Sequence, residues 1–527
     1  MSGSSGNSDR GCDISLGPVT PDSLHRGLGS RGLFPIPPHI WTALVPDTLC
    51  NTIACFVPDT GLNPPSPNTL LMLRSLCRDN FLHKTSQPDT LTAFVKPKSA
   101  VKAAFIADLR QINLLTPSPL PKFNLPRVED IATTLQNTYG DAWWAITFDL
   151  TNFYWSLRLP AGACNWFRIN GLAFDCLPFG WNLSPVIAQN TLTELLYDYV
   201  TYAGFLPFMG HSLLVYIYLD DILILSPDPT WLDGMGHGLH THLTHNNLVV
   251  SPKSSLTPSQ HITWLGKTFN LAAGTIRPTH NCTLRTVATV ILAALVPVHD
   301  KLSARIAGIL LWANRPMLGS TLFLAGLYHH QWARKTRFAH FLSNNCWRAL
   351  ADLLAISIVG WHARPIPTAA ETIFVDAAGS PSAGYQVGLF HHTAGFQVHR
   401  APLALRSQQE GEAYGLEYAL RIAIRVTPHA VAIVGDNKGQ LLNLISLTPR
   451  VSNHTFVRIY RKFFNRLFWT RLAVHVAWAP TALHPADPPS RWSPLLSSVH
   501  GTLMDCTYKY HTLLESGLME HMGVICI

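Results

Sequence analysis

The stretch LLVYIYLDDILILS (residues 213–226) decides the fold, because two adjacent acids interrupt an otherwise apolar run of aliphatic and aromatic residues. Ionised carboxylates are costly to bury unless a partner compensates their charge. Two short apolar segments that meet at a tight connection are typical of a β-hairpin. We therefore expect a hairpin with Asp220 and Asp221 as its two-residue turn, either as an ordinary acidic turn or as metal ligands.

A second apolar segment, WWAITFDLTNFYWSLRLP (143–160), reads as a strand that ends in a lone carboxylate, Asp149. Asp149 and Asp220 can meet if the two strands are neighbours in one sheet. Mg²⁺ takes oxygen ligands, and a pair of such ions clamps the attacking and leaving oxygens in phosphoryl transfer. The two segments together therefore predict a carboxylate site for Mg²⁺, with Mn²⁺ as a possible substitute.

The composition sets limits on the class of protein. A chain of 527 residues is too long for one core, and 47% hydrophobic with 13% charged residues favours a globular protein of two or three domains. A net charge of +8 is compatible with a polyanionic partner but does not prove one. The ten cysteines form no CxxC pair, which argues against a zinc ribbon. No secretory signal or membrane span is evident, so we expect an intracellular protein.

Six segments in order resemble the motifs of reverse transcriptases. YLDD (218–221) resembles the YxDD motif, and FDLTNFYWSLRL (148–159) resembles the first palm motif. ADLRQINLL (107–115) resembles the fingers motif, and LPFGWNLSPVIAQN (177–190) resembles the segment that holds template and incoming nucleotide. NNLVVSPKSSL (246–256) and TWLGKTF (263–269) fall where the family has its lysine motif and primer grip. A single such motif is weak, but the ordered set is specific.

The resemblance implies roles for the matching residues. Asp149 and Asp220 would be the principal metal ligands, with Asp221 alongside. Tyr154 would exclude a ribose 2′-OH by steric clash, unless it is simply a core aromatic. The remaining contacts to template, nucleotide and primer would come from Arg110, Phe179, Gly180, Ser184, Pro185, Lys253, Trp264, Leu265 and Gly266.

Two positions depart from the retroviral pattern. Phe179 stands where those enzymes carry a glutamine, so a side-chain hydrogen bond to the nucleotide is lost. Ala104 aligns with their fingers arginine. We expect Lys96, Lys98 or Lys102 to supply the positive charge instead.

A second acidic set follows residue 371. TIFVDAAGS (372–380) and AVAIVGDNKG (430–439) read as strands that end in Asp376 and Asp436. Glu412 begins the apolar face of an amphipathic helix over 411–426, and Asp487 lies in a late loop. These four residues resemble the D-E-D-D set of ribonuclease H, which binds two Mg²⁺. Glu410 is a nearby alternative to Glu412, and His484 is given no role.

The ending HPADPPSR (484–491) resembles a signature of DIRS-type and gypsy-type retroelements and of hepadnaviral polymerases. No protease pattern such as D-[ST]-G precedes the polymerase, and the 36 residues after Arg491 leave no room for an integrase. These features favour DIRS-type elements, including VIPER-like ones. The resemblance covers roughly residues 91–492.

The predicted fold class is α/β and α+β multidomain: a right-hand polymerase with fingers, palm and thumb, followed by a ribonuclease H-like α/β domain. The predicted boundaries are 1–85 (unassigned extension), 86–270 (fingers and palm), 271–365 (helix-rich thumb and connection), 366–495 (ribonuclease H-like) and 496–527 (tail).

The predicted function is RNA-directed DNA polymerase with ribonuclease H activity. Its partners would be an RNA template, a DNA primer, an RNA–DNA hybrid and deoxynucleoside triphosphates, with no membrane and an unknown oligomeric state. The alternatives are a catalytically decayed nucleic-acid-binding protein and a host-domesticated polymerase. HGLHTHLTH (237–245) could hold a metal ion at helical spacing, but a solvated helix face is favoured.

Overall fold

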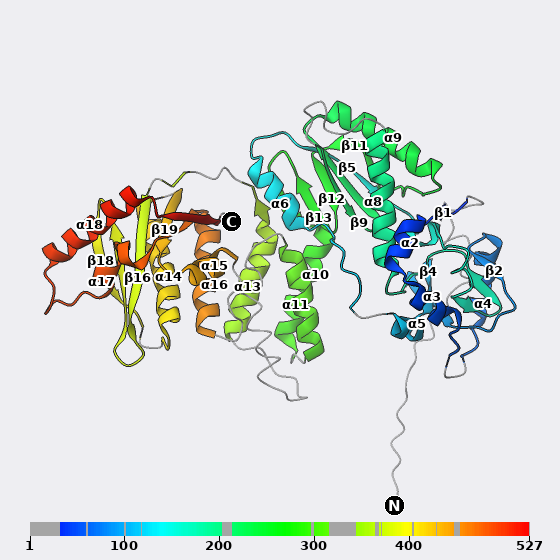
Figure 1. Ribbon diagram of the computed structural model, residues 1–527, viewed down its shortest axis with the longest axis horizontal. Helices are drawn as coiled ribbons and strands as arrows, with labels where there is room; N and C mark the ends of the chain where they lie inside the picture. The colour runs from blue at the N-terminus through cyan, green and yellow to red at the C-terminus, as the bar shows by residue number, and fades with distance from the viewer. Residues whose placement is uncertain are drawn as a thin grey trace, which may run out of the picture. The chain divides into compact units, whose positions relative to one another are not determined.

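The computed structural model describes residues 32–58, 62–99, 102–116, 119–202, 213–296, 300–315, 344–363, 368–369, 371–402, 405–427, 429–446 and 454–525. The chain divides into two compact units (Figure 1). The first comprises residues 1–126 and 143–262, and the second comprises 127–142 and 263–527.

The first unit combines helices with several small sheets. Its helices are α2 (Pro38–Leu44), α3 (Asp47–Ala54), α4 (Pro67–Arg78), α5 (Arg110–Leu115), α7 (Phe153–Ser156), α8 (Ser184–Tyr202) and α9 (Pro229–His245). Its strands are β1 (Phe34–Pro35), β2 (Leu82–Lys84), β3 (Thr92–Ser99), β4 (Lys102–Asp108), β5 (Trp144–Asp149), β6 (Leu157–Arg158), β7 (Arg168–Ile169), β8 (Leu172–Phe174), β9 (Leu214–Tyr218), β10 (Asp221–Ser226) and β11 (Ser255–Ser259). The following strand, β12 (His261–Trp264), spans the boundary between the units.

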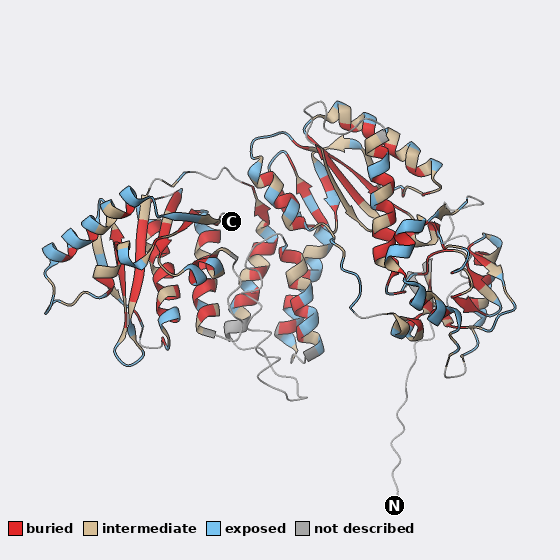
Figure 2. Cartoon of the chain, viewed as in Figure 1, coloured by how far each residue is buried: buried red, intermediate tan, exposed pale blue. Residues whose placement is uncertain are grey.

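The sheet that carries the first acidic set has the strand order β11-β5-β10-β9. Phe148 and Ile146 of β5 pair with Ile222 and Ile224 of β10, and all four are fully buried in the core of the unit. Figure 2 shows the strands of this sheet coloured largely as buried. Residues paired across antiparallel strands point to the same face. The alternate residues therefore share the opposite face, and Asp149 and Asp221 belong to it.

The predicted hairpin is present, but its turn is shifted by one residue. Asp221 is already paired with Tyr218, so the two connecting residues are Leu219 and Asp220 rather than the two aspartates. Leu219 adopts a positive φ of 56°, which a tight antiparallel connection requires at its first position. The shift matters because it places Asp221 in the strand ladder, opposite Asp149.

The predicted N-terminal extension is partly integrated into the first unit. Helices α2 and α3 contribute Trp41, Leu49 and Ile53 to the same core as the central sheet. The Trp41 ring lies 5.6 Å from that of Trp166 and 6.0 Å from that of Trp181. These proline-flanked helices are too short for a helical spacing of apolar residues to be recognised in the sequence. Residues 1–31 lie outside the described part of the chain.

The second unit contains a helical part and an α/β part. Its helices are α6 (Val128–Asn137), α10 (His280–Leu295), α11 (Asp300–Asn314), α13 (Asn344–Val359), α14 (Gln408–Val426), α15 (Lys438–Ser446), α16 (His454–Thr470), η1 (Thr481–Leu483), α17 (Asp487–Ser490) and α18 (Val499–Ser516). Its strands are β13 (Lys267–Asn270), β14 (Thr275–Pro278), β15 (Trp361–His362), β16 (Glu371–Ser380), β17 (Gly384–His391), β18 (Gly395–Arg400), β19 (Ala430–Gly435), β20 (Ala473–Trp478) and β21 (Glu520–Ile525).

The α/β part is built on a six-stranded sheet with the order β18-β17-β16-β19-β20-β21. The pairs β16–β19 and β19–β20 are parallel, whereas β16–β17, β17–β18 and β20–β21 are antiparallel. The predicted tail is therefore wrong as a separate segment, because β21 extends this sheet and α18 packs beside α17. Alternation over EHMGVI was too short to reveal a strand in isolation.

The predicted fold class, mixed α/β and multidomain, is confirmed. The division into two units differs from the predicted boundaries, since 127–142 and 263–270 lie with the second unit. Within the described residues, no helix combines the length and apolar character that crossing a membrane requires.

Candidate active sites

The first acidic set is assembled by strand pairing. Asp149 ends β5 and lies directly opposite Asp221, the first residue of β10. Asp220 occupies the adjacent turn, and its carbonyl accepts a hydrogen bond of 2.9 Å from the Leu150 N–H. The structure thus brings the three predicted carboxylates to one end of a four-stranded sheet.

The turn that carries Asp220 is held by a buried amide that the sequence analysis did not single out. Gln189, on α8, accepts a hydrogen bond of 2.8 Å from the Leu219 N–H through Oε1 and donates one of 2.9 Å to the Ile217 carbonyl through Nε2. A positive φ is unfavourable for leucine. The two hydrogen bonds from one side chain offset this cost and fix the turn.

A segment between α9 and β11 forms hydrogen bonds with the backbone of Asp149 on both its N–H and its carbonyl. The Asp149 N–H donates to Ser254 Oγ at 2.9 Å, and its carbonyl accepts from the Ser251 N–H at 2.7 Å. Lys253 lies between these two serines. Its positive charge acts on both Asp220 and Asp221 and favours their ionised forms.

Burial and mutual repulsion dominate the electrostatics of this set. Burial, and next the charges of Asp220 and Asp149, raise the pKa of Asp221 to about 6. Burial raises the pKa of Asp220 as well, with the Asp149 charge acting in the same direction. Like charges held this close favour a bound cation, because it removes the repulsion. The oxygen-only donor set fits a hard divalent ion such as Mg²⁺ or Mn²⁺.

Two aromatic side chains lie next to the carboxylates. Burial, followed by the charge of Asp220, raises the pKa of Tyr154 to about 12, so the phenol stays neutral near this acid. The Tyr154 ring meets that of Phe179 edge to face, with the centroids 5.5 Å apart. Phe179 is 61% exposed, although large apolar side chains are usually buried. The pair therefore presents an apolar wall beside the acidic set.

The segment that follows Phe179 makes contacts that mainly shape its own loop. Ser184 is fully buried and donates to the Pro178 carbonyl at 2.7 Å, and Pro185 follows it in the first turn of α8. Gly180 has a φ of 104°, which favours glycine, and its carbonyl accepts from Asn113 at 3.0 Å. These residues shape the loop rather than offer exposed hydroxyl groups.

Arg110 is exposed and begins α5. Its guanidinium pairs with Asp108, with Nε–Oδ1 at 2.8 Å and NH2–Oδ2 at 2.5 Å. A template phosphate would have to compete with this carboxylate. The side chains of Lys98 and Lys102 lie outside the described part of the chain.

The predicted primer-grip residues belong to the second unit. Trp264 is 3% exposed, so its ring is a packing element. Leu265 and Gly266 form the turn between β12 and β13, with φ values of 45° and 70°. The backbone of Leu265 and Gly266 is therefore accessible to a ligand, whereas the Trp264 side chain is not.

The second acidic set surrounds a small pocket in the α/β part of the second unit. Asp376 of β16, Glu412 of α14 and Asp436, which follows β19, line it together with Asn437 and Gln440. Asp376 lies within β16 rather than at its end, because the strand continues to Ser380. The structure thus brings together three of the four predicted residues.

Neutral side chains hold these three carboxylates in place. Ser490 Oγ donates to Asp376 at 2.6 Å, Thr481 Oγ1 donates to Asp436 at 2.8 Å, and Asn437 Nδ2 donates to Glu412 at 2.6 Å. Burial, more than neighbouring charge, raises the pKa of Asp376 to about 6 and that of Glu412 to about 7. Such pKa values are typical of a site that a cation would complete.

Glu410 does not reach this pocket. Its carboxylate accepts from the Arg406 N–H at 2.7 Å, and its own N–H donates to Ser407 Oγ, the residue that precedes α14. Glu410 thereby caps the helix, and Glu412, two residues later in α14, lines the pocket.

Asp487 is placed differently from the other three acids. It starts the short helix α17 instead of lying in a loop, and it is paired with Arg491 at 2.9 Å and Lys509 at 3.1 Å. It does not line the pocket, although its charge contributes to the raised pKa of Asp376. Two cations therefore neutralise it in this structure.

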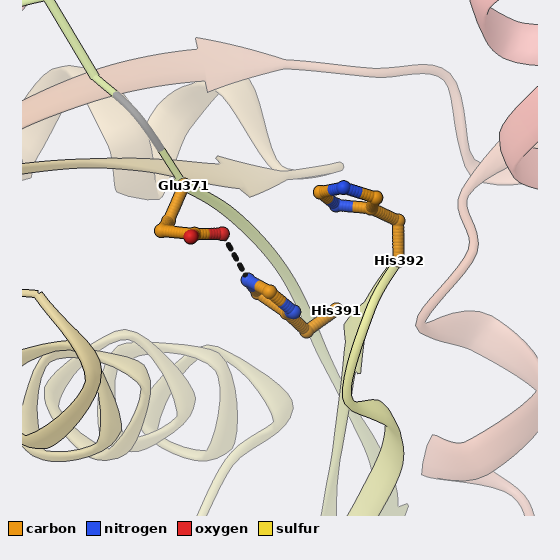
Figure 3. A group of neighbouring side chains, drawn as sticks. All are labelled: Glu371, His391 and His392. Carbon is orange, nitrogen blue, oxygen red and sulfur yellow. Dashed lines mark hydrogen bonds and ion pairs between the residues drawn. The ribbon is translucent and has the colours of Figure 1, made fainter.

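Among the described residues, one further group has the composition of a metal site: Glu371, His391 and His392 (Figure 3). His391 Nδ1 accepts the Ala394 N–H at 3.2 Å, so its Nε2 carries the proton shared with Glu371 at 2.7 Å. The nitrogen that would bind a metal is thus committed to the hydrogen bond. The group is best described as a hydrogen bond from His391 to Glu371 that connects the end of β17 to the start of β16.

The residues that position the carboxylates were not predicted from the sequence. Gln189 and Ser490 lie inside quoted motifs, LPFGWNLSPVIAQN and HPADPPSR, so the motif itself was the available signal. The histidines of 237–245 lie on α9 as expected, and His237 bonds to the Asp233 carbonyl of its own helix.

The part of the chain that carries the first acidic set matches a known family. Residues 97–269 match the family model for Reverse transcriptase (RNA-dependent DNA polymerase). No curated protein matches the chain. Two similar solved structures are the foamy viral protease-reverse transcriptase dRH in complex with double-stranded DNA (TM-score 0.49, 15% identity, 80% of this chain and 73% of that chain) and the foamy viral protease-reverse transcriptase in complex with double-stranded DNA (0.48, 16%, 80% and 86%). The match over 97–269 identifies a reverse transcriptase domain in this chain.

Proposed function

We propose that the protein is an RNA-directed DNA polymerase that also cleaves RNA in an RNA–DNA hybrid. The observation that carries the first activity is the pairing of Asp149 with Asp221, beside Asp220, within the residues that match the reverse transcriptase family. In this proposal the three carboxylates hold two divalent cations, which when bound would activate the primer 3′-OH and stabilise the charge on the phosphate.

The other residues of this site bind and select the nucleotide. The neutral Tyr154 ring, braced by Phe179, blocks the space of a ribose 2′-OH and so favours deoxynucleotides. Lys253 supplies the nearby positive charge that a triphosphate or its pyrophosphate product needs. Gln189 keeps the Leu219–Asp220 turn rigid, because it bonds to the Ile217 carbonyl and to the Leu219 N–H at the start of that turn.

The second activity is proposed on the arrangement of Asp376, Glu412 and Asp436 around one pocket. These carboxylates would hold Mg²⁺ for phosphodiester hydrolysis. Asp487 would join them once the incoming cation competes with Arg491 and Lys509 for its oxygens. The hydroxyls of Ser490 and Thr481 orient the carboxylates and leave oxygens free to bind the ions.

The proposed partners are an RNA template, a DNA primer, the hybrid and deoxynucleoside triphosphates, and the proposed location is inside the cell, in cytoplasm or nucleus. We also propose that the chain derives from a DIRS-type, VIPER-like retroelement. The support for that origin is the resemblance of HPADPPSR (484–491) to a signature of such elements.

Primer extension on an RNA template with Mg²⁺ or Mn²⁺ tests the polymerase. The wild-type chain should extend a DNA primer with deoxynucleotides, and Asp220→Asn should not. Absence of product from the wild type would favour the rival reading, a decayed or host-domesticated nucleic-acid-binding protein.

Cleavage of the RNA strand in a labelled hybrid tests the second site separately. Asp376→Asn should abolish cleavage and leave extension intact, whereas Asp220→Asn should do the reverse. Cleavage that survives Asp376→Asn would contradict the assignment of this pocket.

A further inference from the structure

Lys267, the first residue of β13, is a lysine with no exposed surface. Its ammonium donates hydrogen bonds of 2.6 Å to the carbonyls of Trp312 and Ala313. Burial lowers its pKa to about 8, although the charges of Cys282 and Glu129 oppose this shift. Burying a lysine is costly, so the presence of Lys267 in the interior calls for a physical role.

The partners of Lys267 explain why the charge is tolerated. Trp312 and Ala313 lie in the last turn of α11, where backbone carbonyls lack partners within the helix. This end of a helix carries a partial negative charge that attracts cations. Lys267 therefore fastens the end of α11 to the start of β13.

The turn before Lys267 is in contact with the same helix. Leu265 and Gly266 both have positive φ, which is the geometry of a type I′ turn. A Cβ added to Gly266 would lie 3.3 Å from the indole nitrogen of Trp312. The Gly266 carbonyl accepts from the Thr279 N–H at 3.1 Å, at the start of α10.

The same helix end is also linked to α6. Arg315, just after α11, pairs with Glu129 of α6 at 3.6 Å and lies over the Trp312 ring at 5.8 Å. The turn Leu265–Gly266, the helices α10 and α11, and α6 thus meet around one buried ammonium. All of these residues belong to the second unit.

We propose that Lys267 is a positioning residue, which anchors the Leu265–Gly266 turn to α11 so that the turn can hold the primer end in register for nucleotide addition. The proposal rests on the polymerase function proposed above. Lys267 itself does not touch nucleic acid, because its ammonium is enclosed and used by two carbonyls.

Lys267→Met tests the proposal, because methionine keeps the apolar stem and removes the ammonium. Steady-state extension by one nucleotide should show kcat reduced about tenfold, with the nucleotide KM within about twofold of wild type, because misplacing a reacting group slows chemistry more than nucleotide binding. RNA cleavage in a hybrid by the same preparation should be unchanged and reports that the chain is folded.

The salt dependence separates positioning from direct phosphate contact. A buried ammonium releases no counterion, so Lys267→Met should leave the slope of log K for primer–template against log salt unchanged. Lys301→Met, which removes an exposed lysine from the same helix, is the matched control and should leave kcat at the wild-type level. A slope that falls by about one on Lys267→Met would mean a phosphate contact and would overturn the proposal.

A pH profile gives a second signature. The charged groups that act on Lys267 are Cys282 of α10, Glu129 of α6 and Arg315. Wild-type kcat should fall between pH 7 and 9 as the ammonium loses its proton, Cys282→Ala should retain this fall, and Lys267→Met should lack it. Loss of the fall in Cys282→Ala would assign it to the thiol and contradict the proposal.

Two further experiments distinguish a failure of the Lys267 anchor from a variant that does not fold and from a failure of the polymerase proposal. If Lys267→Met does not fold, Gly266→Ala displaces the same turn against Trp312 and should reproduce the loss of kcat; wild-type kcat in that variant would refute the anchor. If the wild-type chain makes no product, the polymerase proposal fails. The anchor is then tested by amide hydrogen exchange in β12–β13, which Lys267→Met should accelerate; unchanged exchange would overturn it.

Discussion

The two acidic sets differ in how their carboxylates are positioned. Asp149, Asp220 and Asp221 are placed by the backbone, through one strand pair and one tight turn. Asp376 lies in a strand, Glu412 in a helix and Asp436 just after a strand, and all three are held by hydroxyl and amide side chains. The first set should therefore depend on the geometry of one turn, and the second on several individual hydrogen bonds.

The sharpest test of the backbone-built site is to remove one carboxylate at a time. Asp220→Asn should reduce primer extension at least about 10³-fold, or about 4 kcal/mol of transition-state stabilisation. Asp221→Asn should cost less, about 10- to 100-fold, if Asp149 and Asp220 are the principal ligands. Single-turnover extension measures both, with hybrid cleavage as the internal control. Equal losses would contradict this ranking.

The turn itself can be loosened without touching an acid. Gln189→Leu removes both hydrogen bonds that hold the start of the Leu219–Asp220 turn while keeping a side chain of similar size. We expect extension to fall about 30-fold, because a small displacement of the reacting groups is enough for such a loss. Gln189→Glu keeps the acceptor for the Leu219 N–H and should lose less. Wild-type activity in the leucine variant would mean that the strand ladder alone fixes the turn.

Hybrid cleavage at the second acidic set, whose carboxylates are held by side chains, should depend on a single hydroxyl group. Ser490→Ala removes the 2.6 Å hydrogen bond to Asp376 and should lower hybrid cleavage about tenfold, within the range of orienting residues in metal sites. Primer extension should not change. Ser493→Ala, nearby in the chain, is the matched control. Unchanged cleavage in Ser490→Ala would show that the strand alone positions Asp376.

A buried histidine gives the smallest expected effect. Burial lowers the pKa of His484 to about 4, below its unfolded value, so the stability that neutral His484 contributes is complete above about pH 6.5 and is lost as pH falls toward 4. From pH 7 to 5.5 this costs about 1 kcal/mol of unfolding free energy. The raised pKa values of Asp376 and Glu412 act in the opposite direction.

The measurement is therefore the difference between His484→Gln and wild type, by urea unfolding in EDTA at the two pH values. The glutamine variant should gain about 1 kcal/mol relative to wild type as the pH is lowered. Parallel pH profiles for the two proteins would contradict a neutral, buried His484.

Short-range pattern was enough to locate the first site. Two short apolar segments that flank YLDD predicted the hairpin, and the strand that ends at Asp149 was recognised from its own composition. The one-residue shift of the turn was not predictable, because Leu219 is a poor choice for positive φ and only its contact with Gln189 supports it. Gln189 and Leu219 are 30 residues apart in the sequence, so a local pattern does not predict this contact.

The sequence by itself determined which carboxylates are present, their order and the strands and helices that carry them, since local hydrophobic periodicity sets those elements. Tertiary structure decided the rest. It chose Glu412 over Glu410, because helix capping occupies the latter, and it paired Asp487 with Lys509 from a helix 22 residues away. It also joined β21 to the sheet and enclosed Lys267 against α11. These outcomes depend on long-range packing and on which partners remain for a buried charge, and neither is encoded in a local stretch of residues.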